Sequence, residues 1–246
     1  MKVNFLIAGT QKGGTSALGR YLDAHPMLSM AKKKEVHFFD DETNFAGKSV
    51  DYSRYHSFFS RRRLQRLYGE ATPNYMYWHN APRRIWEYNP KMKLIIILRN
   101  PVDRAFSAWN MEVLRRREFL SFQEAIRTER QRTKEALPFQ HRVYTYVDRG
   151  FYTDQIRRIW NFFTKEQTLF LKSEHLKNEH QNALDCVCDF LGVAKMPHTK
   201  PHIVNARPYA TSMADEDRAY LQTLFEFEIK DLEQMLGWDC SEWLSQ

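Results

Sequence analysis

The sequence has 246 residues, 43% of them hydrophobic, and carries a formal net charge of +7 at pH 7. This length and composition suffice for one large hydrophobic core, so we expect a single domain over residues 1–246. No run of about 18 apolar residues occurs, so no membrane span is expected, and the positive charge favours an anionic partner.

The first element is expected to be a buried strand that leads through a glycine-rich loop into a helix. Residues 3–8 (VNFLIA) are mostly apolar, GTQKGGTS follows at 9–16, and apolar residues recur at helical spacing from 17 to 22. Such an order favours an anion site, because N–H groups at a helix N-terminus point towards the ligand. An ordinary glycine-rich turn between strand and helix is the alternative interpretation.

The glycine-rich loop departs from the nucleotide-binding P-loop pattern G-x-x-x-x-G-K-[ST]. Gly9, Gly14 and Ser16 fit this pattern, but Thr15 stands where the lysine belongs and Lys12 lies inside the loop. The ammonium group of Lys12 would therefore approach a bound phosphate from the loop, and not from the first turn of the helix. This geometry indicates chemistry different from that of a common nucleotidase.

Further along the chain, strands and helices are expected to alternate. Strands are predicted at 27–30, near 69–71, at 92–98 and at 168–171, whereas the stretch from 41 to about 66 shows no clear period and suits loops or short helices. MKLIIIL at 92–98 is apolar apart from Lys93 and is predicted to be the centre of the sheet. Helices are expected after Pro82, after Pro101, from a capping box at 121–124, and at 152–163, 184–191 and 215–236. This order predicts an α/β fold, a three-layer sandwich around a central parallel sheet.

A second basic site is expected where the strand at 92–98 ends. Arg99 follows this strand directly, and Ser107 lies eight residues later, off the apolar face of the next helix. Ligands of such sheets lie outside the carboxyl ends of the strands. A P-loop nucleotidase would normally place a Mg²⁺-binding aspartate there. The arginine favours a ligand with phosphates at two separated points and no metal site.

Four segments in order then carry a family resemblance: FLIAGTQKGGTSAL, EVHFFD, GEATPNY and LIIILRNPVDRAFSAW. The chain resembles sulfotransferases that use 3′-phosphoadenosine 5′-phosphosulfate (PAPS), and is most similar to the heparan-sulfate (glucosaminyl) type. The resemblance implies a P-loop-like sulfotransferase fold. One departure concerns the acceptor, since heparan-type enzymes carry a lysine before T-P-x-Y and this chain has Glu70-Ala71 there.

The resemblance also implies roles for individual residues. The donor's 5′-phosphosulfate would be bound by the loop residues Lys12, Gly13, Gly14, Thr15 and Ser16. Its 3′-phosphate would be bound by Arg99 and Ser107, and Arg207 falls where the family closes a loop over the nucleotide. Lys12 is also predicted to neutralise the charge that develops on the leaving group.

The catalytic base is expected in EVHFFD, at Glu35 or His37. An extended backbone would place both side chains on one face, and Val36 and Phe38 on the other. The unperturbed pKa of histidine, about 6.5, lies nearer working pH than that of glutamate, about 4.3, so the residues alone leave the choice open. The resemblance places the base at Glu35.

The predicted function is transfer of a sulfuryl group from PAPS to a hydroxyl or amine of a small molecule or saccharide, without a metal and with 3′-phosphoadenosine 5′-phosphate (PAP) as product. A P-loop-type kinase or nucleotidase is one alternative, and a polyanion- or RNA-binding module with a degenerate loop is another. No nucleic-acid partner is expected, because no recognition motif accompanies the basic charge. The three cysteines show no disulfide spacing, so a reduced cytoplasmic protein is expected, with a trimmed luminal domain as the alternative.

Overall fold

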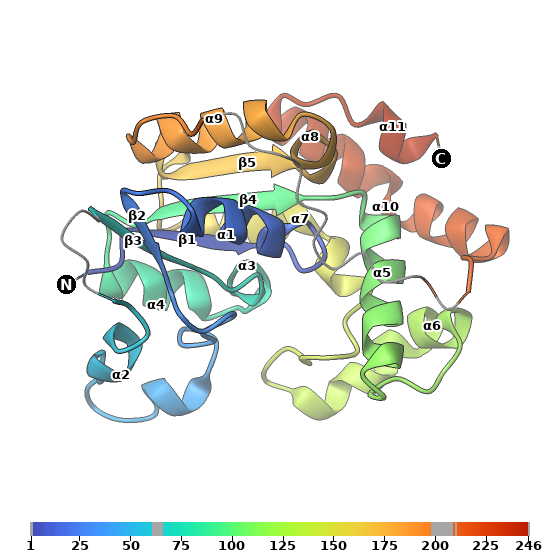
Figure 1. Ribbon diagram of the computed structural model, residues 1–246. Helices are drawn as coiled ribbons and strands as arrows, with labels where there is room; N and C mark the ends of the chain where they lie inside the picture. The colour runs from blue at the N-terminus through green and yellow to red at the C-terminus, as the bar shows by residue number, and fades with distance from the viewer. Residues whose placement is uncertain (1, 61–65, 198–208, 210, 246) are drawn as a thin grey trace. The chain divides into compact units, whose positions relative to one another are not determined.

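The computed structural model of the protein describes residues 2–60, 66–197, 209 and 211–245 (Figure 1). Its contacts divide the chain into two compact units, unit 1 with residues 1–98 and 158–206, and unit 2 with residues 99–157 and 207–246. Unit 1 contains the β-sheet, and the described part of unit 2 is helical. The single domain expected over 1–246 stays a prediction.

The sheet of unit 1 has five parallel strands in the order β2-β3-β1-β4-β5 (Figure 1). They are β1 (Phe5–Gly9), β2 (Leu28–Met30), β3 (Leu67–Ala71), β4 (Lys93–Leu98) and β5 (Thr168–Lys172). The parallel α/β sheet is thus confirmed, but the prediction that 92–98 forms its centre is wrong, because β1 lies there. An apolar run indicates a strand that is covered on both faces of the sheet. This holds for β1 as well as for β4, because every residue of β1 is buried, so the apolar run does not single out the central strand.

Helices cover both faces of this sheet. On one face, alternate residues of β1 and β4 share a hydrophobic core with α1 (Thr15–Asp23), α8 (Ser173–Asn178) and α9 (His180–Leu191). The intervening strand residues are buried too, and on their side α3 (Asn74–Tyr77) contacts β1 and leads into α4 (Ala81–Tyr88). The three-layer arrangement is therefore confirmed in unit 1.

The segment between β2 and β3 forms loops and short helices, as the sequence predicts. It contains a 3₁₀-helix, η1 (Glu42–Phe45), and a single helical turn, α2 (Ser53–His56). Its aromatic side chains pack together and against α3, with the ring centroids of Phe38 and Tyr55 4.8 Å apart and those of Phe39 and Tyr75 of α3 5.5 Å apart. This aromatic cluster supports the EVHFFD segment on its buried side.

Unit 2 is built from helices that begin and end largely where the sequence indicates. They are α5 (Pro101–Leu114), α6 (Phe122–Arg132), the 3₁₀-helices η2 (Thr133–Ala136) and η3 (Asp148–Gly150), α10 (Asp215–Leu236) and α11 (Ser241–Leu244). The helix α7 (Tyr152–Trp160) continues into unit 1, where η4 (Lys165–Gln167) precedes β5. The capping box of Ser121 and Glu124 is confirmed, and α10 ends at Gly237, whose φ of 66° is left-handed.

Two further features bear on the predicted setting of the chain. Among the helices of the described residues, none combines the length and the apolar character that crossing a bilayer requires. All three cysteines are free thiols, with Cys186 exposed and Cys188 and Cys240 buried.

A buried carboxyl group in unit 2 makes the stability dependent on pH. Glu129 accepts hydrogen bonds from the N–H groups of Val147 (2.7 Å) and Asp148 (2.8 Å). Burial raises the pKa of Glu129 from its ordinary 4.5 to about 7, and the two N–H donors only partly oppose this. Folding therefore takes up a proton between these values, and the stability that Glu129 contributes is lost as pH rises towards 7.

We predict that Glu129→Gln flattens this dependence. The loss of unfolding free energy between pH 5 and 7 should be smaller in the variant by about 2 kcal/mol, even though its stability is lower throughout. Urea denaturation at both pH values measures the difference, with Glu242→Gln at an exposed position as control. Equal slopes for the wild type and Glu129→Gln would contradict the assignment.

Candidate active site

The glycine-rich loop connects β1 to the N-terminus of α1. The N–H of Thr10 donates to the carbonyl of Ile97 in β4 (2.8 Å), and the N–H of Gly13 donates back to Thr10 (3.0 Å). Lys12 and Gly14 have left-handed backbones, with φ of 73° and 109°. Gly14 caps α1, so the N–H groups of Thr15 and Ser16, which begin the helix, have no acceptor within it. This is the arrangement of an anion site at a helix N-terminus.

The position of Gly13 accepts no side chain. A Cβ atom added there would lie 2.4 Å from the carbonyl oxygen of Ile97, which belongs to the backbone of β4 and cannot rotate away. The loop therefore reaches its conformation only because glycine lets it approach the neighbouring strand. The alternative interpretation, an ordinary turn, does not require so close an approach.

Glu35 and His37 lie together, but not through the expected extended backbone. Both residues are left-handed, with φ of 53° and 57°, so the extended conformation predicted for EVHFFD is wrong. Their side chains nevertheless meet, with 3.5 Å between His37 Nε2 and Glu35 Oε2, and both remain about one third exposed, at 38% and 34%. Val36 and Phe38 are buried, as expected.

The other ring nitrogen of His37 contacts a buried carboxylate. His37 Nδ1 lies 2.8 Å from Asp40 Oδ2, and the side-chain amide of Asn74 donates to the same oxygen. Burial lowers the pKa of His37, but hydrogen bonds to Asp40 and Glu35 outweigh it and raise the value to about 9. At neutral pH the ring is an imidazolium that donates from both nitrogens, so it has no lone pair with which to accept a proton.

Both features lie at the same edge of the sheet. β1 and β3 are parallel neighbours, with Ile7 paired to Ala71, and the loop begins where β1 ends. Just beyond the end of β3, the hydroxyl of Thr72 accepts a 3.5 Å hydrogen bond from the N–H of His37. The glycine-rich loop and the Glu35–His37 pair are therefore both attached at carboxyl ends of adjacent strands, the edge at which such sheets bind ligands.

Glu70, which lies in the segment where heparan-type enzymes carry a lysine, is only 1% exposed. Its carboxylate accepts hydrogen bonds from hydroxyl groups inside unit 1 and does not face solvent. In this protein Glu70 is a buried residue that does not itself present a charge to an acceptor.

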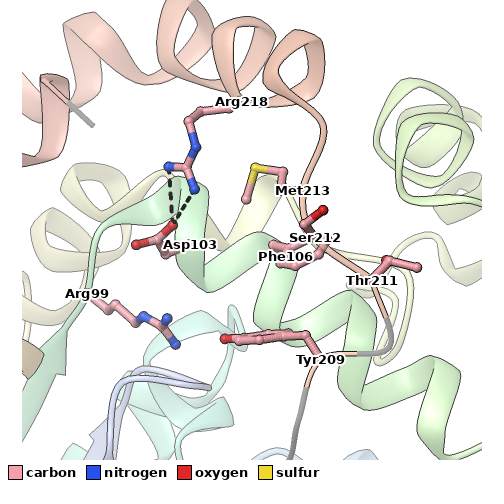
Figure 2. Close-up of a pocket in the computed structure, with 8 residues that line it drawn as sticks. All are labelled: Arg99, Asp103, Phe106, Tyr209, Thr211, Ser212, Met213 and Arg218. Atoms are coloured by element: carbon pink, nitrogen blue, oxygen red, sulfur yellow. Dashed lines mark hydrogen bonds and ion pairs between the residues drawn. The ribbon is translucent and has the colours of Figure 1, made fainter.

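The remaining predicted residues belong to unit 2. Arg99 lines a cavity of about 530 Å³, whereas Ser107 is buried in α5 and does not line it, and Arg207 lies outside the described residues. Figure 2 shows the side chains around this cavity: Arg99, Asp103, Phe106, Tyr209, Thr211, Ser212, Met213 and Arg218.

The cavity combines positive charge with an aromatic wall. The rings of Phe106 and Tyr209 stack with centroids 5.3 Å apart, and Arg218 reaches Asp103 at 3.4 Å (Figure 2). Two guanidinium groups against one carboxylate leave a net positive cavity, which suits a phosphate. The sequence does not predict Arg218 as a site residue, because a lone arginine in the first turns of a long helix resembles any solvated charge.

The glycine-rich loop, the helix α1 and the parallel sheet together define an α/β protein with a P-loop-like anion site. The sequence model of the sulfotransferase domain matches residues 2–207. The chain belongs to the sulfotransferase family.

Similar proteins agree with this membership. The chain is 31% identical to heparan sulfate glucosamine 3-O-sulfotransferase 6 of Homo sapiens over 209 residues, which are 82% of this chain and 55% of that protein. It is 34% identical over 110 residues to the membrane-associated sulfotransferase kil1 of Dictyostelium discoideum, covering 45% of this chain and 23% of that one. The chain thus spans about half, or less, of the length of these curated relatives.

Among solved structures, a sulfotransferase from Alicyclobacillus acidocaldarius is similar over nearly the whole chain. It is 31% identical, covers 99% of both chains and has a TM-score of 0.82. The sulfotransferase domain from the curacin biosynthetic pathway shares 15% identity with a TM-score of 0.50, over 80% of this chain and 76% of that one, which shows likeness of fold alone.

We predict that Gly13→Ala disrupts the glycine-rich loop. The added methyl group must displace the backbone at Ile97, so the unfolding free energy should fall by about 1–3 kcal/mol and binding of PAP should be lost. Gly47→Ala is the control, because its nearest neighbour is 3.6 Å away, and it should leave both quantities nearly unchanged. Thermal melts with and without PAP measure both effects, and a Gly13→Ala protein that still binds PAP normally would contradict the prediction.

Proposed function

We propose that the protein transfers a sulfuryl group from PAPS to a hydroxyl or amine of an acceptor. The observation that supports this best is that the glycine-rich loop and the Glu35–His37 pair, through the backbone of His37, are attached at adjacent strand ends of one sheet. The loop supplies N–H groups and the ammonium of Lys12 for the donor's 5′-phosphosulfate, with Gly13, Gly14, Thr15 and Ser16 around it. Membership of the sulfotransferase family supports the choice of donor.

The reaction is a direct transfer. Glu35 takes the proton of the attacking group while its oxygen or nitrogen forms a bond to sulfur, and the bond from sulfur to the bridging oxygen of the 5′-phosphate breaks. The electron pair remains on that oxygen, where Lys12 neutralises the developing charge. Such a transfer gains mainly from positioning and from charge neutralisation, as phosphoryl transfer does.

His37 supports the assignment of the base to Glu35. An imidazolium whose pKa is about 9 is already protonated at neutral pH, so it cannot take the acceptor's proton. The ring lies 3.5 Å from the carboxylate of Glu35, so it can hold this side chain in place without competing for the acceptor's proton. We therefore assign the base to Glu35 and a positioning role to His37.

The cavity of unit 2 supports binding of the donor's 3′-phosphate by Arg99, with Arg218 as a further cation. Ser107 and Arg207 remain proposed ligands by resemblance. Asp103 competes for Arg218 in the described structure, so a phosphate has to displace this 3.4 Å ion pair or share it.

The acceptor is proposed to be a saccharide or another small molecule. The curated relatives include an enzyme named for heparan sulfate glucosamine, which supports a saccharide. Lys32, Lys33 and Lys34 precede Glu35 and are exposed, which favours an acceptor that carries negative charge. The cytoplasmic location expected from the sequence stays a prediction.

We predict that PAP raises the melting temperature of the protein in the presence of a metal chelator. Arg99→Ala and Arg218→Ala should each weaken PAP binding, by about 1.5–3 kcal/mol for Arg99, because each removes a charge-assisted contact. Asp103→Asn should strengthen it, since it removes a competing carboxylate from the cavity. Titration calorimetry measures the affinities, and stabilisation by ATP and Mg²⁺ equal to that by PAP would favour a kinase or nucleotidase instead.

We predict that Glu35→Gln and Lys12→Ala act on turnover more than on donor binding. Gln retains the size of the side chain without its basicity, so turnover should fall by roughly 10² or more while the donor dissociation constant changes little. Lys12→Ala should lower kcat for the same donor because the leaving group loses its cation. Steady-state kinetics separate these effects, and a Glu35→Gln enzyme with normal kcat, beside an inactive His37→Ala enzyme, would assign the base to His37.

A further inference from the structure

Glu70 has no part in the proposed chemistry, although it is an almost fully buried carboxyl group near the end of β3. Three hydroxyl groups donate to it: Thr72 to Oε2 at 2.6 Å, and Tyr75 and Tyr55 to Oε1 at 2.8 and 3.1 Å. Burial raises the pKa of Glu70, and these three hydrogen bonds lower it. Burying an ionisable group is costly unless hydrogen bonds satisfy it, and the three hydroxyl donors offset this cost. A carboxyl group that is kept in the interior with three dedicated donors suggests a role beyond packing.

Two of these hydroxyl groups also accept hydrogen bonds from the segment that carries the proposed base. The Tyr75 hydroxyl accepts a hydrogen bond from the N–H of Phe38 at 3.0 Å, and the Thr72 hydroxyl accepts one from the N–H of His37 at 3.5 Å. A hydroxyl has one hydrogen and two lone pairs. Because Glu70 takes the hydrogen of each, the lone pairs are left to face the two backbone donors.

The segment from Glu35 to Asp40 needs such support. Glu35 and His37 are both left-handed, a conformation that residues with a side chain hold only where the surroundings enforce it. The bend places the His37 ring against Asp40 on one side and Glu35 on the other. If the backbone at His37 and Phe38 relaxed, these side-chain contacts would be lost together.

We propose that Glu70 is a positioning residue that acts through Tyr75 and Thr72 to hold the Glu35–Asp40 segment in its reactive conformation. The inference deepens the proposed function and rests on it, since it explains how the chain keeps the base in place. Tyr55 donates a hydrogen bond to the same Glu70 oxygen as Tyr75. The N–H of Phe38, however, donates to the hydroxyl of Tyr75 and not to that of Tyr55. Tyr75 and Tyr55 therefore form a matched pair for a test.

The test compares Tyr75→Phe with Tyr55→Phe. Each change removes one hydroxyl donor from Glu70 Oε1 and retains an aromatic ring in the core, but only Tyr75→Phe also removes the acceptor for the Phe38 N–H. With PAPS as donor and desulfated heparan sulfate as acceptor probe, kcat should fall at least tenfold in Tyr75→Phe and less than twofold in Tyr55→Phe. The KM for PAPS should stay within twofold in both variants.

Titration of His37 by NMR gives a second result that needs no acceptor. The pKa of about 9 depends on hydrogen bonds from His37 to Asp40 and Glu35, so it should fall by at least one unit in Tyr75→Phe and in Glu70→Gln. It should be unchanged in Tyr55→Phe. The His37 signal is assigned by its loss in His37→Gln, and thermal melts check that all variants fold.

Equal effects of Tyr75→Phe and Tyr55→Phe on the His37 titration, or no effect of Glu70→Gln on it, would overturn the role of Glu70. The proposed function fails separately: an unmodified protein that releases no PAP from PAPS with any acceptor would refute sulfuryl transfer, even if the NMR contrast between the two tyrosine variants is found.

Discussion

The contact of the His37 ring with two carboxylates is the interaction on which the proposed chemistry depends. Asp40 is fully buried and also accepts from the amide of Asn74, so its position is set by the interior of unit 1. His37 is held against Asp40 at 2.8 Å and presents its other nitrogen to Glu35. The ring thus links a fixed, buried carboxylate to the partly exposed carboxylate that is proposed as the base.

The sheet supplies the second constraint. Because β1 and β3 are neighbours, the segments attached to their carboxyl ends are brought to one edge: the glycine-rich loop after β1, and Thr72, which contacts the backbone of His37, after β3. The loop reaches its conformation only because Gly13 presents no Cβ atom to the carbonyl of Ile97. The proposed anion site and the proposed base would both be held in place in this way, as a reaction governed by positioning and charge requires.

Much of the fold is predictable because its signals are local. The parallel strands, the capping box at Ser121 and the end of α10 at Gly237 follow from patterns within a few residues. The order of the strands cannot be predicted from such signals, because β1 and β4 are both mostly apolar. Nothing within either segment indicates which of the two takes the central position. Only the pairing of distant segments decides it.

Some features of the candidate site can likewise be predicted from local sequence, and others cannot. The residues of GTQKGGTS and EVHFFD can be found from their order in the chain, whereas the left-handed backbones of Glu35 and His37 are imposed by tertiary contacts that no local pattern encodes. The burial of Glu70 is hidden because a glutamate in a sequence suggests exposure, and its partner Tyr55 comes from a separate helix. The protonation state of His37 likewise depends on Asp40 being buried beside it.

The most direct test of the central claim uses PAPS labelled with ³⁵S in the sulfuryl group and ³³P in the 5′-phosphate. The labelled donor is incubated with the protein, a chelator, and a panel of saccharides, phenols, alcohols and amines. Sulfuryl transfer predicts that an acceptor gains ³⁵S alone and that all ³³P is recovered in PAP. Transfer of ³³P to an acceptor, or a strict requirement for a divalent cation, would contradict it.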